Sequence, residues 1–298
     1  MRNPRPSSAG DVGVDTATLG PRRRQLRRQL RDQATHAQYR TPASASRYGD
    51  AYEGWGSVAR FNRSRRHAVD EAILGSQGDL VDIGSGPGMF VRHLLDTRPG
   101  DFRITACDRS PAMIDAAAGR LTTADPEVCL SVSRIEDLPF DDSSFDVALA
   151  LGVLEYVDIA KALPEVSRIV RPGGLVVATM LNPASPYRLF EWCIYWPARR
   201  LAGRIEGLLG IQPNRRHGAR RSGIHAVRRG RLARLMRAAG LTPYDVVAFD
   251  ITSTVPPLDK LVRRHSRRWR DHPERTVSRG LRGRMGTGYL IAARKVSC

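Results

Sequence analysis

Cysteine is scarce in this sequence, and long hydrophobic runs are missing from it. No two cysteines form a CxxC pair, and none has a histidine at metal-ligand spacing; the four are Cys107, Cys129, Cys193 and Cys298. This scatter argues against a structural zinc site and a disulfide framework, so we expect no metal and a reducing compartment. No apolar run approaches the roughly 18 residues that a membrane-spanning helix needs, and no apolar leader is visible, so we expect a cytoplasmic protein.

Lysine is also scarce, although the net charge is +18: only three of the 48 basic residues are lysines. The charge is unevenly distributed, because residues 75–182 have a net charge of −7, residues 1–74 of +7 and residues 183–298 of +18. Basic flanks of this kind can bind nucleic acid. An arginine bias is as typical of a GC-rich coding sequence, and the core between the flanks is acidic. We therefore do not expect a nucleic-acid partner.

The most informative stretch is DLVDIGSGPGMF at residues 79–90. Its apolar start predicts a buried strand that ends at Ile83. A tight turn is predicted at Gly84, Gly86 and Gly88, followed by a helix. Glycine allows positive φ and close approach of a ligand, and the free N–H groups at a helix start favour an anionic group. A strand, glycine turn and helix in this order are typical of a nucleotide-like cofactor site at the end of a parallel sheet.

A second apolar strand, at residues 102–107, leads to the carboxylate of Asp108, 20 residues after Gly88. An acid at this place can accept hydrogen bonds from both hydroxyls of a ribose. The three glycines of the turn alternate with single residues, whereas the last two glycines of the dinucleotide fingerprint are three apart. The tighter spacing leaves little room for a pyrophosphate and argues against NAD.

From about residue 79 to residue 183, the sequence resembles the class I S-adenosylmethionine-dependent methyltransferases, most closely the small-molecule group related to quinone-biosynthesis enzymes. Four ordered blocks carry the resemblance and are together far more specific than any one alone. They are residues 82–88 (DIGSGPG), Asp108, residues 138–147 (LPFDDSSFDV) and residues 163–175, which include RPGG.

The resemblance implies S-adenosylmethionine as the cofactor. By the resemblance, residues 82–88 form the loop that holds the methionine part of the cofactor. Asp108 binds the ribose, and Arg109 and Met113 flank the adenine. The expected cofactor-binding residues are Asp82, Gly84, Gly86, Gly88, Asp108, Arg109, Met113, Ile135, Glu136 and Leu151.

Two positions depart from the family pattern. The family usually has an aspartate four residues before Leu-Pro-Phe, where it contacts the adenine amino group; here the residue is Arg134. Ile135 retains a backbone N–H for the ring, and Glu136 or Asp137 is a candidate replacement acceptor. A histidine that is common after the fourth strand is replaced by Tyr156. Neither change removes the expected methionine or ribose contacts.

The predicted fold is α/β: a Rossmann-like, seven-stranded, mostly parallel sheet with helices on both faces. Alternation of strands and helices indicates the parallel core, and the resemblance adds the last two strands, the final one antiparallel. The expected strands are residues 79–83, 102–107, 128–132, 145–151, 174–180, 243–250 and 288–294. We also expect a helix at residues 58–74, and one at residues 229–239 that ends at Gly240.

The domain prediction has two parts: a disordered basic tail at residues 1–45 and one methyltransferase domain at residues 46–298. Two insertions, at residues 181–227 and 251–285, follow strands at the carboxyl edge of the sheet. Open α/β folds bind ligands at that edge. We therefore expect both insertions to wall a substrate pocket.

The first insertion contains an aromatic stretch with flanking arginines, residues 187–204. This composition suits a cap over a flat hydrophobic substrate, and it leaves open a peripheral contact with an anionic membrane surface. The second insertion contains an arginine-rich segment, residues 263–270, which we interpret as a solvated basic helix. Near the start of the domain, Tyr48, Tyr52 and Trp55 are candidates for a lid over the cofactor, with ordinary packing as the alternative.

Methyl transfer depends mainly on orientation and exclusion of water, and needs a base only when the acceptor must lose a proton. Glu155, Tyr156, His225 and His265 are base candidates by position alone, so no catalytic residue is assigned. Residues 151–156 lack an Asn-Pro-Pro-Tyr motif, which argues against amino methylation of nucleobases or glutamine amides.

We predict O- or C-methylation of a hydrophobic small molecule of natural-product, quinone or lipid type. The alternatives are an RNA methyltransferase that uses the basic flanks, and a non-catalytic cofactor-binding or membrane-peripheral protein.

Overall fold

The computed structural model describes residues 41–54, 56–121, 128–210, 212, 225–252 and 272–296. Trp55, His265, the arginine-rich segment 263–270 and most of the expected N-terminal tail lie outside these ranges. Within them, no helix is both long enough and apolar enough to cross a bilayer.

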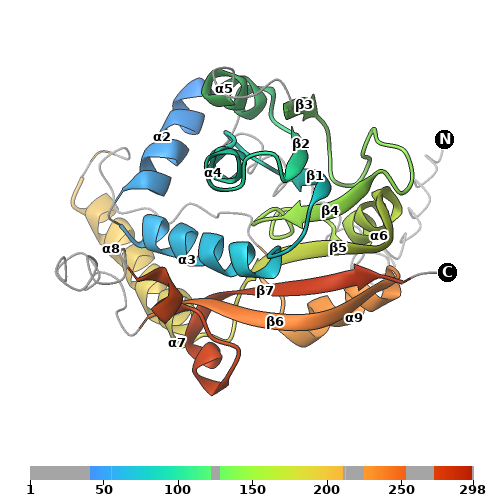
Figure 1. Ribbon diagram of the computed structural model, residues 1–298. Helices are drawn as coiled ribbons and strands as arrows, with labels where there is room; N and C mark the ends of the chain where they lie inside the picture. Colours follow the sequence, from blue (N-terminus) through green and yellow to red (C-terminus); the bar gives the residue numbers. More distant parts are fainter. Residues whose placement is uncertain are drawn as a thin grey trace, which may run out of the picture.

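A seven-stranded sheet forms the centre of the molecule, with the strand order β3-β2-β1-β4-β5-β7-β6 (Figure 1). The strands are β1 Gly78–Ile83, β2 Phe102–Asp108, β3 Val128–Val132, β4 Phe145–Ala150, β5 Val170–Leu181, β6 Leu241–Ile251 and β7 Gly286–Lys295. Strand β7 is antiparallel to both β5 and β6, and the other pairs are parallel. The predicted fold class, including the antiparallel last strand, is confirmed.

Helices cover both faces of the sheet. The longer ones are α2 Pro42–Glu53, α3 Ser57–Ala72, α4 Met89–Thr97, α5 Pro111–Leu121, α6 Ile159–Ile169, α8 Trp196–Leu208 and α9 Arg229–Ala238. The shorter ones are α7 Pro186–Phe190, the π-helix η1 Glu191–Tyr195, and the 3₁₀ helices η3 Pro273–Thr276 and η4 Leu281–Met285.

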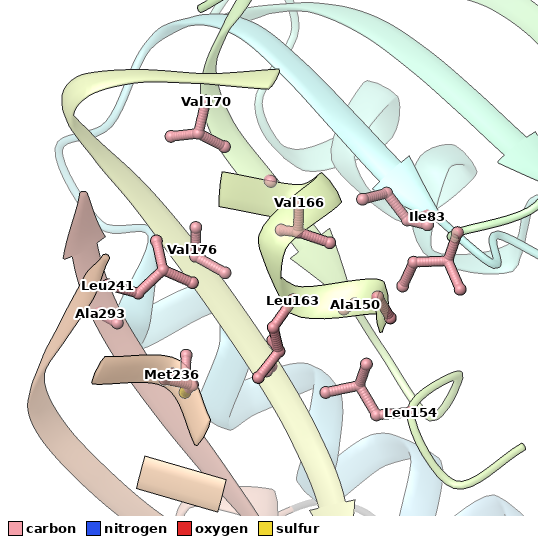
Figure 2. Packing of buried hydrophobic residues seen from close by; sticks show 14 of the residues in the cluster. Ile83, Ala150, Leu154, Leu163, Val166, Val170, Val176, Met236, Leu241 and Ala293 are labelled. Carbon is pink, nitrogen blue, oxygen red and sulfur yellow. The ribbon is translucent and has the colours of Figure 1, made fainter. Parts of the chain in front are cut away.

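The hydrophobic core is divided by the sheet because side chains alternate along each strand. On β5, Val176 and Met180 belong to the cluster under α6 and α9, while Leu175 and Val177 belong to the cluster under α3 and α4. Figure 2 shows the first cluster, in which Leu163 of α6 lies close to β5. A near-continuous apolar strand such as β5 is expected when both faces of a sheet are covered.

Two element boundaries differ from the sequence prediction for clear physical reasons. Helix α2 begins at Pro42, inside the segment expected to be tail, because Thr41 and Ser44 form a reciprocal capping box. Strand β5 begins at Val170 rather than at residue 174. Phe145 pairs with Val170 but Val147 pairs with Leu175, so the intervening residues bulge out of the ladder.

Candidate cofactor site

The loop between β1 and α4 is fixed to the end of β2 by backbone hydrogen bonds. The N–H groups of Gly84 and Ser85 both donate to the carbonyl of Cys107, at 2.7 and 3.0 Å. Gly84, Gly86 and Gly88 have φ values of 74°, 55° and 73°, in the left-handed region that favours glycine. The three glycines are therefore required by the path of this loop.

The three glycines have different surroundings. A Cβ on Gly84 would stand 2.8 Å from the side chain of Val153, and one on Gly88 would stand 3.2 Å from Ala117. A Cβ on Gly86 would meet nothing within 4 Å. Packing thus explains the outer two glycines, whereas the middle one faces open space beside the cavity.

Asp108, at the end of β2, holds the same loop from the other side. Its carboxylate accepts the N–H of Gly86 at 3.0 Å and the N–H of Ser110 at 2.9 Å. Burial raises the pKa of Asp108, and these two backbone donors oppose that rise. A carboxylate offers about four acceptor positions, so two remain for hydroxyl groups of a ligand.

A cavity opens above this loop. Of the ten residues predicted to bind cofactor, eight line it: Gly84, Gly86, Asp108, Arg109, Met113, Ile135, Glu136 and Leu151. Gly88 instead packs against α5 as the N-cap of α4, and Asp82 is fully buried behind the loop. The cavity has a volume of about 130 Å³. Ligand sites usually measure roughly 300–1,000 Å³, so the closed part of this cavity is smaller than a typical ligand site.

The two residues that depart from the family pattern, Arg134 and Tyr156, both line this cavity. Arg134 and Glu136 both line it, and the Arg134 Nε lies 3.7 Å from the Glu136 Oε2. Ile135 is buried, with its apolar side chain in the core cluster. Val153 and Val157 also line the cavity. Their role was not predictable, because single valines after a strand carry no distinguishing signal in the sequence.

Buried charges lie behind the cavity, and the central one, on Arg65, has no distinguishing signal in the sequence. Arg65 of α3 is fully buried, and its Nη1 donates to the carbonyl of Leu151 at 3.3 Å. Burial raises the pKa of both Asp82 and Glu155 to about 7, and the positive charge of Arg65 opposes the rise. Within the described part of the chain, one carboxylate oxygen of each acid has no hydrogen-bond partner. Such buried polar atoms are suited to a polar ligand.

The base candidates occupy different places. Glu155 accepts the N–H of Leu181 at 3.0 Å and is buried, so it joins β5 to the segment after β4. Tyr156 lines the cavity. The backbone N–H of His225 donates to the carbonyl of Glu155, but its side chain is exposed. Of the lid candidates, Tyr48 lines the cavity, whereas Tyr52 is buried and does not line it.

The Asp82→Asn variant is expected to be more stable than the wild type at pH 8 by about 4 kcal/mol, because the pKa of Asp82 differs by about three units between the folded and unfolded states. The carboxyl of Asp82 ionises near pH 4 when unfolded and near pH 7 when folded. The wild type therefore loses stability as the pH rises between these values, and the amide avoids the loss. Urea unfolding at pH 4 and pH 8 measures the effect, which should vanish at pH 4. Exposed Asp115→Asn is the control, and an equal gain there would contradict the assignment.

The central part of the chain is similar to known methyltransferases. Residues 81–178 match the family model described as a methyltransferase domain. The ubiquinone/menaquinone biosynthesis C-methyltransferase UbiE of Geobacter sp. (strain M21) is 33% identical over 136 residues, which cover 44% of this chain and 57% of the relative. The malonyl-[acyl-carrier protein] O-methyltransferase of Erwinia billingiae is 34% identical over 149 residues, covering 49% and 57%. The chain thus spans little more than half the length of these relatives.

A solved structure extends the likeness to most of the fold. A SAM-dependent methyltransferase from Thermotoga maritima superposes with a TM-score of 0.54 at 23% identity, covering 84% of this chain and 97% of that one. The glycine loop, Asp108, the strand order and the matched family model agree with one another. Residues 81–178 therefore match a methyltransferase domain, and the predicted resemblance to the class I S-adenosylmethionine-dependent methyltransferases is confirmed.

Proposed function

We propose that the protein transfers a methyl group from S-adenosylmethionine to an oxygen or carbon atom of a hydrophobic small molecule. The observation that carries the proposal is the pairing of Gly86 and Asp108 at the cavity floor. The backbone of Gly86, which has no side chain, lies beside the half-buried carboxylate of Asp108, which has acceptor positions left for a ligand. This combination suits a ribose with two neighbouring hydroxyl groups.

The remaining cofactor contacts follow from the chemistry of each wall. Met113, Ile135 and Leu151 provide apolar surface for an adenine ring. Arg65 and Asp82, behind the loop, provide charges of both signs, as a zwitterionic amino-acid group needs. When bound, the cofactor supplies an electrophilic methyl group on a sulfonium. The protein's contribution is to orient the acceptor and exclude water, which suffices for large rate gains.

A hydrophobic acceptor is favoured by the cavity wall beyond the cofactor loop. Val153, Tyr156 and Val157 line the cavity, and so does Tyr48 of α2. Of the two relatives named above, the one named for ubiquinone/menaquinone biosynthesis is consistent with such an acceptor, and the other is named for malonyl-[acyl-carrier protein]. Among the residues that line this cavity, only Arg109 and Arg134 are basic. That balance argues against an extended phosphate backbone at the reacting end.

The test is transfer of labelled methyl from S-adenosylmethionine to a panel of acceptors. The panel holds demethylated isoprenoid quinones, phenolic polyketides, acyl-carrier substrates and total RNA. Labelling of a hydrophobic acceptor, with RNA unlabelled, supports the proposal. Labelling of RNA alone would replace it with the nucleic-acid alternative.

We also propose a peripheral membrane contact through residues 187–204 and the rest of α8, which lies at the periphery of the molecule (Figure 1). The spacing of Leu201, Ile205 and Leu208 puts them on one face of α8, yet they are 58%, 49% and 88% exposed. Arg200 and Arg204 are exposed beside that face. An exposed apolar face flanked by arginine is typical of a helix that lies on anionic lipid.

Leu201→Glu/Ile205→Glu is expected to reduce binding to anionic vesicles about 100-fold or more, because the lipid contact loses two apolar side chains that contribute roughly 1.5–3 kcal/mol each when buried in lipid. Sedimentation with vesicles of phosphatidylglycerol and phosphatidylcholine measures the bound fraction. The control is Leu74→Glu/Leu281→Glu, which changes two other exposed leucines to the same residue. Equal binding by both double variants would rule out this contact.

A further inference from the structure

A second cavity, of about 900 Å³, lies between the start of α9 and the turn that contains η4. It shares no lining residue with the cofactor cavity. Asn182 and Pro183, just after β5, form its floor together with Val246 of β6. The cavity therefore opens toward the carboxyl edge of the sheet, on the side of β6 and β7.

The lining of this cavity is strongly basic. No aspartate or glutamate is among the lining residues, but six arginines are. They are Arg228, Arg229, Arg231, Arg234, Arg279 and Arg284. Arg279 is neutralised by Asp245 at 3.0 Å and by Glu71 at 3.2 Å. In the portion of the chain that the structure describes, no carboxylate pairs with Arg228, Arg229, Arg231 or Arg284. Four like charges thus line one cavity, and no carboxylate of the described residues pairs with them.

Three of these charges stand where the helix itself disfavours them. Arg228 is the N-cap of α9, and Arg229 and Arg231 lie in its first turn, which contains no acidic residue. The positive end of a helix dipole is destabilised by cations and stabilised by anions. No side chain caps this helix start either. A sequence that breaks a local rule in this way usually does so at a functional site.

Both walls of the cavity are held in place by contacts within the fold. The hydroxyl of Tyr289 in β7 donates to the carbonyl of Val227 at 2.6 Å, which fixes the entry into α9. Across the cavity, Gly283 packs so tightly that a Cβ there would stand 3.0 Å from Ala248 and 3.1 Å from the carbonyl of Ser278. Arg284 extends from this tightly packed turn. Basic groups on two anchored walls therefore face one space.

We propose that this cavity binds the phosphate or diphosphate group of a small molecule. Guanidinium groups match phosphate oxygens in pairs, and the helix start adds backbone N–H donors with a favourable dipole. A nucleic-acid strand fits less well, because binding of single strands relies on exposed aromatic rings for stacking. Tyr289 is the only aromatic residue in the lining, is 3% exposed and has its hydroxyl engaged. The proposal does not depend on methyl transfer.

The experiment titrates the full chain with inorganic pyrophosphate by calorimetry, at about 0.15 M salt to screen weak surface attraction. The test variant is Arg231→Gln/Arg284→Gln, with one change on each wall. The matched control is Arg237→Gln/Arg282→Gln, which removes the same charge from the same two elements, α9 and η4, outside the cavity lining. We expect the affinity for pyrophosphate to fall about tenfold or more in the test variant and less than about twofold in the control.

Other results would overturn the proposal. They are the absence of pyrophosphate binding to the wild type at millimolar concentration, and an equal loss in both double variants, which would indicate only a net-charge effect. Displacement of pyrophosphate by a tighter-binding RNA oligonucleotide would reassign the cavity to nucleic acid. Titration of the same samples with S-adenosylhomocysteine reports the first cavity separately. It also verifies folding, and a failure of the proposed function would appear only there.

Discussion

Replacing Asp108 with alanine is expected to weaken S-adenosylhomocysteine binding by about 100-fold or more. The carboxylate has two acceptor positions left after its bonds to Gly86 and Ser110. Two charge-assisted hydrogen bonds to ribose hydroxyls, at about 1.5–3 kcal/mol each, account for a loss of this size. Calorimetric titration of the purified chain measures it directly, and S-adenosylmethionine should follow the same order.

The alanine variant also removes two hydrogen bonds that hold the glycine loop, so stability must be measured beside affinity. Asp115→Ala, which removes an exposed acid from α5, controls for the loss of charge. Asp108→Asn retains an acceptor for one backbone donor. It should therefore unfold at a higher urea concentration than the alanine variant, but its affinity for S-adenosylhomocysteine should also be low. Unchanged affinity in Asp108→Ala would mean that no ribose sits against this carboxylate.

Strand positions and the glycine loop were predictable because their signals are local. Alternation and apolar runs depend on the period of the strand, and positive φ at a turn requires glycine whatever the rest of the chain does. The strand ends differed where pairing decides the boundary: the bulge between Phe145 and Val147 in the ladder with β5 has no signature in either strand alone. The family resemblance supplied the antiparallel β7, which composition and periodicity did not indicate.

The buried charges were not predictable because burial of a polar side chain is decided by tertiary packing. Arg65 lies in the run RSRR, and nothing in that run distinguishes it from its neighbour Arg66. Only the path of α3 across the sheet places one of them behind the cavity. The basic cavity was not predictable from the sequence for a similar reason. Its two walls are about 50 residues apart in sequence, and the arginine bias of the whole chain hid the local cluster.

Gly86→Ala is expected to weaken S-adenosylhomocysteine binding about 100-fold at a modest cost in stability. Gly86 has a φ of 55°, which costs a residue with a Cβ about 1–2 kcal/mol. The added methyl group meets no protein atom within 4 Å, so packing of the folded chain is unaffected. The methyl group would instead occupy the space beside Asp108 that S-adenosylhomocysteine must enter. Calorimetric titration gives the affinity, and urea unfolding of the same samples gives the stability.

Gly75→Ala separates these two effects. Gly75 has a φ of 75°, a Cβ there also meets nothing within 4 Å, and the residue does not line the cavity. Both alanine variants should therefore lose similar stability, because backbone strain is their shared cost. Only Gly86→Ala should lose the ligand, because only there does the methyl group occupy the site. If both variants bind S-adenosylhomocysteine like the wild type, the open space at Gly86 serves the loop and the cofactor lies elsewhere.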